Sequence, residues 1–167
     1  MNSESLDVYY QSYVNDIYRY LYALCRQYHL AEDLTQETFY RAYLYLEDCR
    51  EDKIKPWLFR VAYNAFIDYM RKARRSIPAE AGYFNALPHP ETTEEVFMRR
   101  SRMEELAAAV GGLPEAQRHA LLLHDFHGIA YKDAAAIMEV SLPQYKILIF
   151  RARQQLREGE RRSSGHE

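Results

Sequence analysis

The stretch AYKDAAAIMEVSLPQYKILIFRARQ, residues 130–154, decides the fold of the C-terminal part of the chain. Its first half predicts a short helix over about 130–138, and its second half predicts a longer helix over about 142–158. A tight turn is expected between them at residues 139–141. Three consecutive alanines, residues 134–136, leave room for the two helices to pack closely. Together these features predict a helix-turn-helix.

The second of these helices carries polar side chains suited to reading DNA. Ser141 is expected to cap its N-terminus, with Pro143 in the first turn. The side chains that can reach phosphates and base edges from the major groove are Gln144, Lys146, Arg151 and Arg153. On pattern alone, an ordinary helical hairpin with a basic exposed face explains the same residues, so both interpretations stay open.

The remaining periodic segments are helical as well. Apolar residues recur at three- and four-residue steps, which predicts helices over about 4–27, 31–47, 56–75, 94–110 and 114–126. Most of the 15 tyrosines fall on these apolar stripes, so we expect them in the core with their hydroxyls at its rim. No segment alternates as a strand does, and the predicted fold class is all-α.

Periodicity fails between the third and fourth helices. Residues 76–93 contain Pro78, Gly82, Pro88 and Pro90, all of which interrupt helices. We interpret this segment as a flexible linker. The chain is then two small helical domains, residues 1–75 and residues 94–167, and the second contains the helix-turn-helix.

The net charge of −2 hides two basic blocks in an acidic chain. Residues 53–75 hold seven basic side chains against Asp68 alone, and residues 142–162 hold six against two acidic ones. Such blocks are either solvated faces or two surfaces that contact phosphates. Because the acidic remainder weakens free binding to DNA, a DNA-binding role requires a partner that delivers the protein to its site.

Other classes of function find little support. The first 20 residues lack a signal peptide's basic start and apolar middle, and no apolar run reaches the roughly 18 residues of a membrane span, so we expect a cytoplasmic protein. Cys25 and Cys49 form no CxxC pair. His124 and His127 lack a third ligand, and we interpret them as a surface pair. We expect no metal, no cofactor and no small-molecule substrate.

Three motifs, in this order along the chain, resemble a known family. They are AEDLTQETF at 31–39, KPWLFRVAYN at 55–64 followed by Asp68 and Arg71, and the segment from Gly112 to Leu156 that ends in FRAR at 150–153. They are similar to regions 2.2, 2.3–2.4 and 4 of extracytoplasmic-function (ECF) sigma factors, group IV of the sigma-70 family. The likeness is greatest to the sigma-M type of Gram-positive bacteria, which acts in cell-envelope stress.

The resemblance implies a non-catalytic subunit that gives RNA polymerase its promoter specificity. Core polymerase, through its β′ clamp coiled coil and β subunit, would bind Asp33, Leu34, Gln36 and Glu37. A second set of residues would recognise and open the −10 element and hold it as a single strand. These residues are Arg60, Asn64, Asp68, Arg71, Lys72, Arg74 and Arg75. Duplex DNA at the −35 element would meet Ser141, Gln144, Tyr145, Lys146, Arg151 and Arg153. The family also implies an anti-sigma factor, commonly membrane-anchored.

One departure from the family's pattern concerns the −35 helix. Ile147 and Leu148 stand where the family usually has polar residues, so the promoter preference is expected to differ from that of relatives. The main rival hypothesis is a helix-turn-helix regulator that works without polymerase, but it leaves residues 33–37 and 55–71 unexplained. A helical enzyme using Glu37 or the His124–His127 pair lacks a nucleophile–base constellation.

Overall fold

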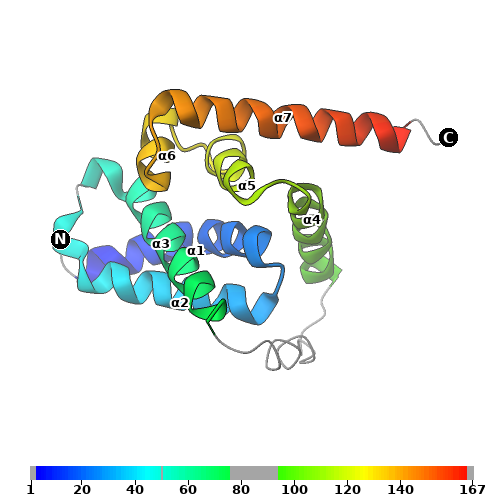
Figure 1. The fold of residues 1–167 in the computed structure, drawn as a ribbon. Coiled ribbons are helices and arrows are strands. Elements are labelled where there is room, and N and C mark those ends of the chain that lie inside the picture. The colour runs from blue at the N-terminus through cyan, green and yellow to red at the C-terminus, as the bar shows by residue number, and fades with distance from the viewer. Residues whose placement is uncertain (1–2, 50, 76–93, 165–167) are drawn as a thin grey trace. The chain divides into compact units, whose positions relative to one another are not determined.

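The computed structural model describes residues 3–49, 51–75 and 94–164, and all regular structure in them is helical, which confirms the predicted class. Contacts group the chain into two units, Met1–Ala107 and Ala108–Glu167. Two 3₁₀ turns, η1 (Leu46–Asp48) and η2 (Glu51–Lys53), precede α3, and a π-helical turn, η5 (Leu122–Phe126), follows α5. The α-helices are α1 (Ser3–Cys25), α2 (Tyr28–Leu44), α3 (Ile54–Ala73), α4 (Glu94–Gly111), α5 (Glu115–Leu121), α6 (Tyr131–Met138) and α7 (Leu142–Ser164) (Figure 1).

In the first unit, α1, α2 and α3 pack on one another around an apolar core. Its largest fully buried side chains are Ile17, Tyr20 and Leu21 from α1, and Leu58 and Phe59 from α3. The ring of Tyr20 meets the ring of Phe59 edge-on, with centroids 5.3 Å apart. This arrangement is one that aromatic pairs favour, and it ties the first helix to the third.

The connection between α1 and α2 is shorter than the sequence indicates. Arg26 takes the left-handed conformation with φ 57°, and its N–H donates to the carbonyl of Tyr22 at 2.8 Å. A residue in the left-handed conformation commonly stands directly after the end of a helix. Gln27 is extended, and α2 starts at the next residue. The predicted helix over 31–47 is therefore displaced by three residues toward the N-terminus.

Tyrosine burial differs from the prediction. Tyr20, Tyr22 and Tyr145 are buried, as expected of core residues. The tyrosines that are instead exposed are Tyr10, Tyr40, Tyr43, Tyr45 and Tyr69. The prediction was wrong for these five because helical spacing alone does not distinguish a core stripe from a second, exposed aromatic face.

The helix α4 is shared between the two units. Its residues up to Ala107 group with the first unit, where the Tyr28 hydroxyl donates to Glu104 at 2.7 Å and the Arg100 guanidinium lies 4.7 Å from the Tyr28 ring centroid. The sequence assigned all of this helix to the second domain. The predicted linker, residues 76–93, lies outside the described residues, so its flexibility and the domain bounds stay predictions.

The second unit contains the helix-turn-helix, whose turn is held by backbone and side-chain bonds. Glu139 ends α6 in the left-handed conformation, and the N–H groups of Glu139 and Val140 donate to Ala136 and Ala135. This is a Schellman ending. Ser141 and Gln144 then exchange two bonds, each 3.2 Å long, between side chain and backbone N–H. This reciprocal capping box confirms Ser141 as the cap and sets where α7 begins.

The region before α6 contains the two histidines. Gly128, with φ 70°, ends the π-helical turn as predicted for the helix end. His127 is buried, so the expected surface pair is wrong. His124 lies 2.8 Å by Nδ1 from the carbonyl oxygen of Ile129 and stacks against Tyr131, with ring centroids 4.0 Å apart. Both histidines thus serve packing of the second unit.

Candidate functional site

The outer side of α2 presents an acidic face, defined here as Asp33, Gln36 and Glu37. The side chains of Asp33 and Gln36 are exposed and that of Glu37 is partly exposed. On the opposite side of the helix, the hydroxyls of Thr35 and Thr38 are buried and donate to backbone carbonyls four residues earlier. These internal bonds satisfy the buried hydroxyls, so the helix packs on one side and leaves a hydrogen-bonding, negatively charged surface on the other.

Arg41 connects this acidic face to α3. Its Nε donates to Glu37 at 2.9 Å, and its NH1 donates to Asp68 at 2.8 Å. Burial lowers the pKa of Arg41, but the hydrogen bonds that its guanidinium donates to the two carboxylates, together with their negative charges, outweigh burial and raise the pKa overall. One guanidinium thereby holds a residue expected at the polymerase surface and a residue expected at the −10 DNA.

The exposed side of α3 forms a basic face. Arg60 and Asn64 are exposed one helical turn apart, and the same side continues to the C-terminal end of the helix. Asp68 differs from its neighbours because its carboxylate is bound by Arg41 of α2, but its side chain stays partly exposed, so its contact with −10 DNA stays a prediction. The other predicted −10 residues that are exposed are Arg71, Lys72, Arg74 and Arg75.

The helix α7 presents a second basic face. Lys146 and Arg151 are exposed, and so are two large apolar side chains, Ile147 and Phe150. Ser141 and Gln144 are also exposed, although both are engaged in the capping box. The surface that α7 offers to solvent is therefore cationic at its flanks and apolar between them.

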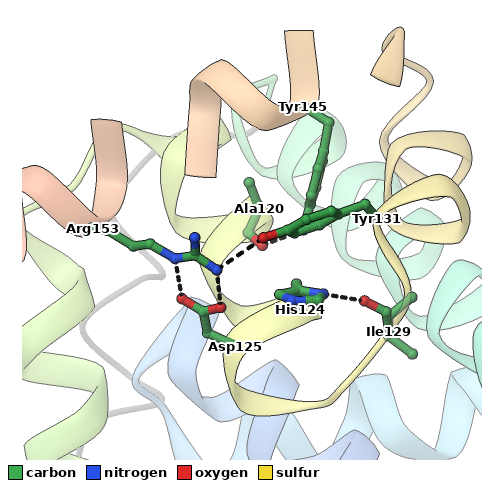
Figure 2. A network of polar contacts seen from close by, with 7 residues as sticks. All are labelled: Ala120, His124, Asp125, Ile129, Tyr131, Tyr145 and Arg153. Atoms are coloured by element: carbon green, nitrogen blue, oxygen red, sulfur yellow. Dashed lines mark hydrogen bonds and ion pairs between the residues drawn. The ribbon is translucent and has the colours of Figure 1, made fainter. Parts of the chain in front are cut away.

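A polar network anchors the inner side of α7 (Figure 2). Arg153 holds Asp125 of the π-helical turn with two bonds, 2.9 Å from Nε and 2.6 Å from NH2, and it also donates to the Tyr131 hydroxyl at 3.2 Å. Tyr145 is fully buried and donates its hydroxyl to the carbonyl of Ala120. The hydrogen bonds from Arg153 lower the pKa of Asp125. These contacts tie α7 to three preceding segments.

Comparison with known proteins matches both units to one family. Residues 9–76 match the model of Sigma-70 region 2, and residues 103–156 match that of Sigma-70, region 4. The chain is 40% identical over 158 residues to the ECF RNA polymerase sigma factor SigM of Bacillus subtilis, covering 92% of this chain and 93% of that one. The chain belongs to the ECF sigma factors.

More distant relatives agree with this assignment. The ECF sigma factor SigE of Mycolicibacterium smegmatis is 32% identical over 92% of this chain, which spans 61% of that longer protein. Among solved structures, the sigma factor RpoE of Bartonella quintana, in complex with the anti-sigma factor NepR, superposes with a TM-score of 0.74 at 25% identity. That match covers 93% of this chain and 96% of RpoE.

For this ECF sigma factor, two of the predicted contact residues are wrong. Leu34 is buried in the core of the first unit, so its side chain supports α2 from within and does not reach a partner. Tyr145 is buried beneath α7 and cannot touch DNA in this fold. Both lie in motifs where buried and exposed residues are neighbours along the helix.

The sequence also missed exposed residues on two helices of the sigma factor. Tyr40 and Tyr43 continue the line of the acidic face along α2, and Phe150 lies on the outer side of α7 beside Ile147, which the sequence had already indicated. The available signal was helical spacing, because Tyr40 lies three residues after Glu37, Tyr43 three after Tyr40, and Phe150 four after Lys146. No cluster of three or more possible metal ligands occurs among the described residues, and none of the helices they form is long and apolar enough to cross a membrane.

Arg153 is expected to stabilise the sigma factor's second unit, because its guanidinium is already bound to Asp125 and Tyr131. Arg153→Ala should lower the stability of this unit by about 1 kcal/mol, because hydrogen bonds to charged groups contribute roughly that much or more and this pair is partly exposed. A loss of that size corresponds to a fall in Tm of about 4–8 °C in a small domain, measurable by thermal unfolding of the full chain.

Arg151 is the matched control, because it is exposed on the same helix. Arg151→Ala should leave Tm unchanged and lower the salt slope of holoenzyme binding to duplex promoter DNA by about one unit, as one lost phosphate contact does. A lower salt slope for Arg153→Ala with an unchanged Tm would return Arg153 to the DNA surface.

Proposed function

We propose that this sigma factor divides its work among three surfaces. The acidic face on α2 binds a basic surface of core polymerase, the β′ clamp coiled coil. The basic face on α3 recognises the −10 element and holds its opened strand. The outer side of α7 reads the −35 element as duplex DNA. The protein itself catalyses nothing, and polymerase performs the chemistry.

The observation that carries this proposal is the pairing of two unlike faces in the first unit. One helix exposes Asp33 and Gln36, and a neighbouring helix exposes Arg60 and Asn64. Carboxylates complement a cationic protein surface, whereas guanidinium groups hold phosphates and an amide can pair with a base edge. A regulator that only binds duplex DNA needs its helix-turn-helix but neither of these faces.

The −10 strand requires an additional feature, a place for an unstacked base. Extruding a base costs a few kcal/mol, which contacts in a pocket and a cationic track for the strand offset. The two 3₁₀ turns η1 and η2 lie directly before α3 and are the proposed walls of such a pocket. Trp57 lies in the first turn of α3 and is partly buried, and we propose a core role for it.

The proposal includes regulation and location. The RpoE structure is that of a sigma factor in complex with an anti-sigma factor, NepR. We propose that this chain has an anti-sigma partner, commonly a membrane protein, that covers the polymerase and DNA surfaces in the cytoplasm until a signal arrives. We also propose a cell-envelope stress regulon, as the resemblance to the sigma-M type implies.

In vitro transcription on a pool of random promoters tests the proposal. Core polymerase with this chain should produce transcripts from a subset of templates that share two elements, near −35 and −10, whereas core polymerase alone should not. Specific duplex binding by the isolated chain at physiological salt, without promoter-selective transcription, would favour a polymerase-independent regulator instead.

A further inference from the structure

The outer side of α7 carries an aliphatic residue at the centre of its surface. Tyr145, Ile149 and Ala152 are buried and mark the inner side of the helix. At about 100° per residue, Ile147 lies about 200° round the helix from Tyr145, nearly opposite this inner side. The exposed fraction is 50% for Ile147 and 61% for Phe150, which lies about one turn further along the helix.

Charges flank this apolar centre on both sides. Lys146 and Arg151 are exposed and lie to either side of Ile147 on the helical surface. Cations placed this way complement the two phosphate backbones that border a DNA groove. Ile147 also lies in the second turn of the second helix of a helix-turn-helix, and such helices use their N-terminal residues to contact base edges.

The chemistry of the major groove leaves one apolar partner for Ile147. Its floor offers hydrogen-bond donors and acceptors at every base pair, together with the 5-methyl group of thymine. An isoleucine has no donor or acceptor, so it would leave a guanine, cytosine or adenine edge without a bond after water is displaced. Contact with a methyl group removes apolar surface from water on both partners.

We propose that Ile147 reads the 5-methyl group of a thymine in the −35 element and so sets the base preference of this sigma factor at one position. The inference rests on the proposed function, because it requires α7 to lie in the major groove of the −35 duplex. Beyond that function, the inference specifies the chemistry of one contact. At that base, an apolar contact between Ile147 and a methyl group takes the place of a hydrogen bond.

The test is a deoxyuridine scan of a promoter selected from the pool. Each thymine of the −35 element, on either strand, is replaced singly by deoxyuridine, which lacks the methyl group and keeps base pairing unchanged. At one position the replacement should weaken binding of the wild-type holoenzyme by about fourfold, the value of one buried methyl group. Ile147→Ala holoenzyme should bind the thymine and deoxyuridine promoters equally.

Leu142→Ala is the matched control, since Leu142 is also an exposed apolar residue of α7 but lies at its first position. It should keep the full sensitivity to deoxyuridine. The contact is disproved if no position is sensitive, if Ile147→Ala keeps the sensitivity, or if Ile147→Ala impairs binding of a protein partner and leaves promoter binding unchanged.

A further pair of measurements distinguishes failure of the Ile147 contact from failure of the proposed function. Scrambling the −35 element and replacing Lys146 by alanine should each weaken wild-type binding if α7 reads duplex DNA. Loss of the methyl effect with both of these effects intact overturns only the Ile147 contact. Absence of all three effects removes α7 from the −35 element and overturns the inference together with its premise.

Discussion

Replacing Asp33 and Glu37 together by arginine is expected to abolish binding to core polymerase while the chain stays folded. The two reversals change the charge of the acidic face by four units, and like charges facing each other across an interface cost several kcal/mol. Affinity should therefore fall by roughly 100-fold or more, since each 1.4 kcal/mol is a factor of ten. Co-purification with core enzyme, followed by a titration, measures the loss.

The role of Glu37 in pairing with Arg41 calls for two controls. Glu37→Arg removes a partner of Arg41 and places a second cation beside it, so part of its effect can be internal to the fold. Asp33→Arg alone avoids this, because Asp33 is an exposed residue one turn away, and it should still weaken binding strongly. Circular dichroism and thermal unfolding report whether the double variant is folded.

A matched pair of charge reversals tests whether net charge alone is responsible. Asp7→Arg combined with Asp16→Arg also changes the first unit by four units, but on α1. This variant should bind polymerase within a few-fold of the wild type. If a folded Asp33→Arg/Glu37→Arg chain binds normally, or if the α1 pair is equally defective, the acidic face of α2 is not the polymerase-binding surface.

The helices and the helix-turn-helix were predictable because local signals agreed with one another. The capping box between Ser141 and Gln144 involves only four consecutive residues, and two of the three alanines before it, Ala134 and Ala135, are buried as close helix packing requires. Where apolar spacing, a capping residue and a helix-breaking residue agree, local sequence largely determines the bounds of a helix.

The roles of individual charged residues were less predictable, because their partners are distant in sequence. Arg153 is bound to Asp125, 28 residues earlier, and Arg41 is bound to Asp68, 27 residues later. The spacing of residues on one helix shows which way a side chain points. It does not show whether a carboxylate from a distant part of the sequence lies close enough to bind it. The π-helical turn that presents Asp125 has no local signal either, since it depends on how α5 and α7 pack.

Tyr145 shows how a family motif can obscure a physical pattern. It lies four residues before Ile149 and seven before Ala152, a spacing that predicts one buried stripe along α7. The family resemblance implies a place for Tyr145 among DNA-contacting residues, whereas the apolar spacing predicts that it is buried. Apolar spacing alone therefore predicts that α7 has an inner side with Tyr145 and an outer side with Lys146 and Ile147.

A promoter with a pre-opened bubble is expected to separate the roles of α3 and α7. Lys146→Ala should weaken the closed complex, because Lys146 lies on the helix that meets duplex DNA before melting. Asn64→Ala should leave −35-dependent recruitment intact and reduce opening, because its amide can pair with a base edge only after strands separate. A lost contact of this kind corresponds to about 1–3 kcal/mol, or roughly 5- to 150-fold in open-complex yield.

The bubble removes the cost of separating the −10 base pairs, so it should rescue the variant that is impaired in opening. Transcript yield of Asn64→Ala should recover substantially on the bubble template, and that of Lys146→Ala should recover less. Permanganate reactivity of unstacked thymines measures opening on the duplex template. Arg157→Ala, which removes an exposed cation further along α7, serves as the control and should behave as the wild type on both templates. Equal rescue of the two variants, or none for Asn64→Ala, would show that α3 and α7 do not act at separate steps.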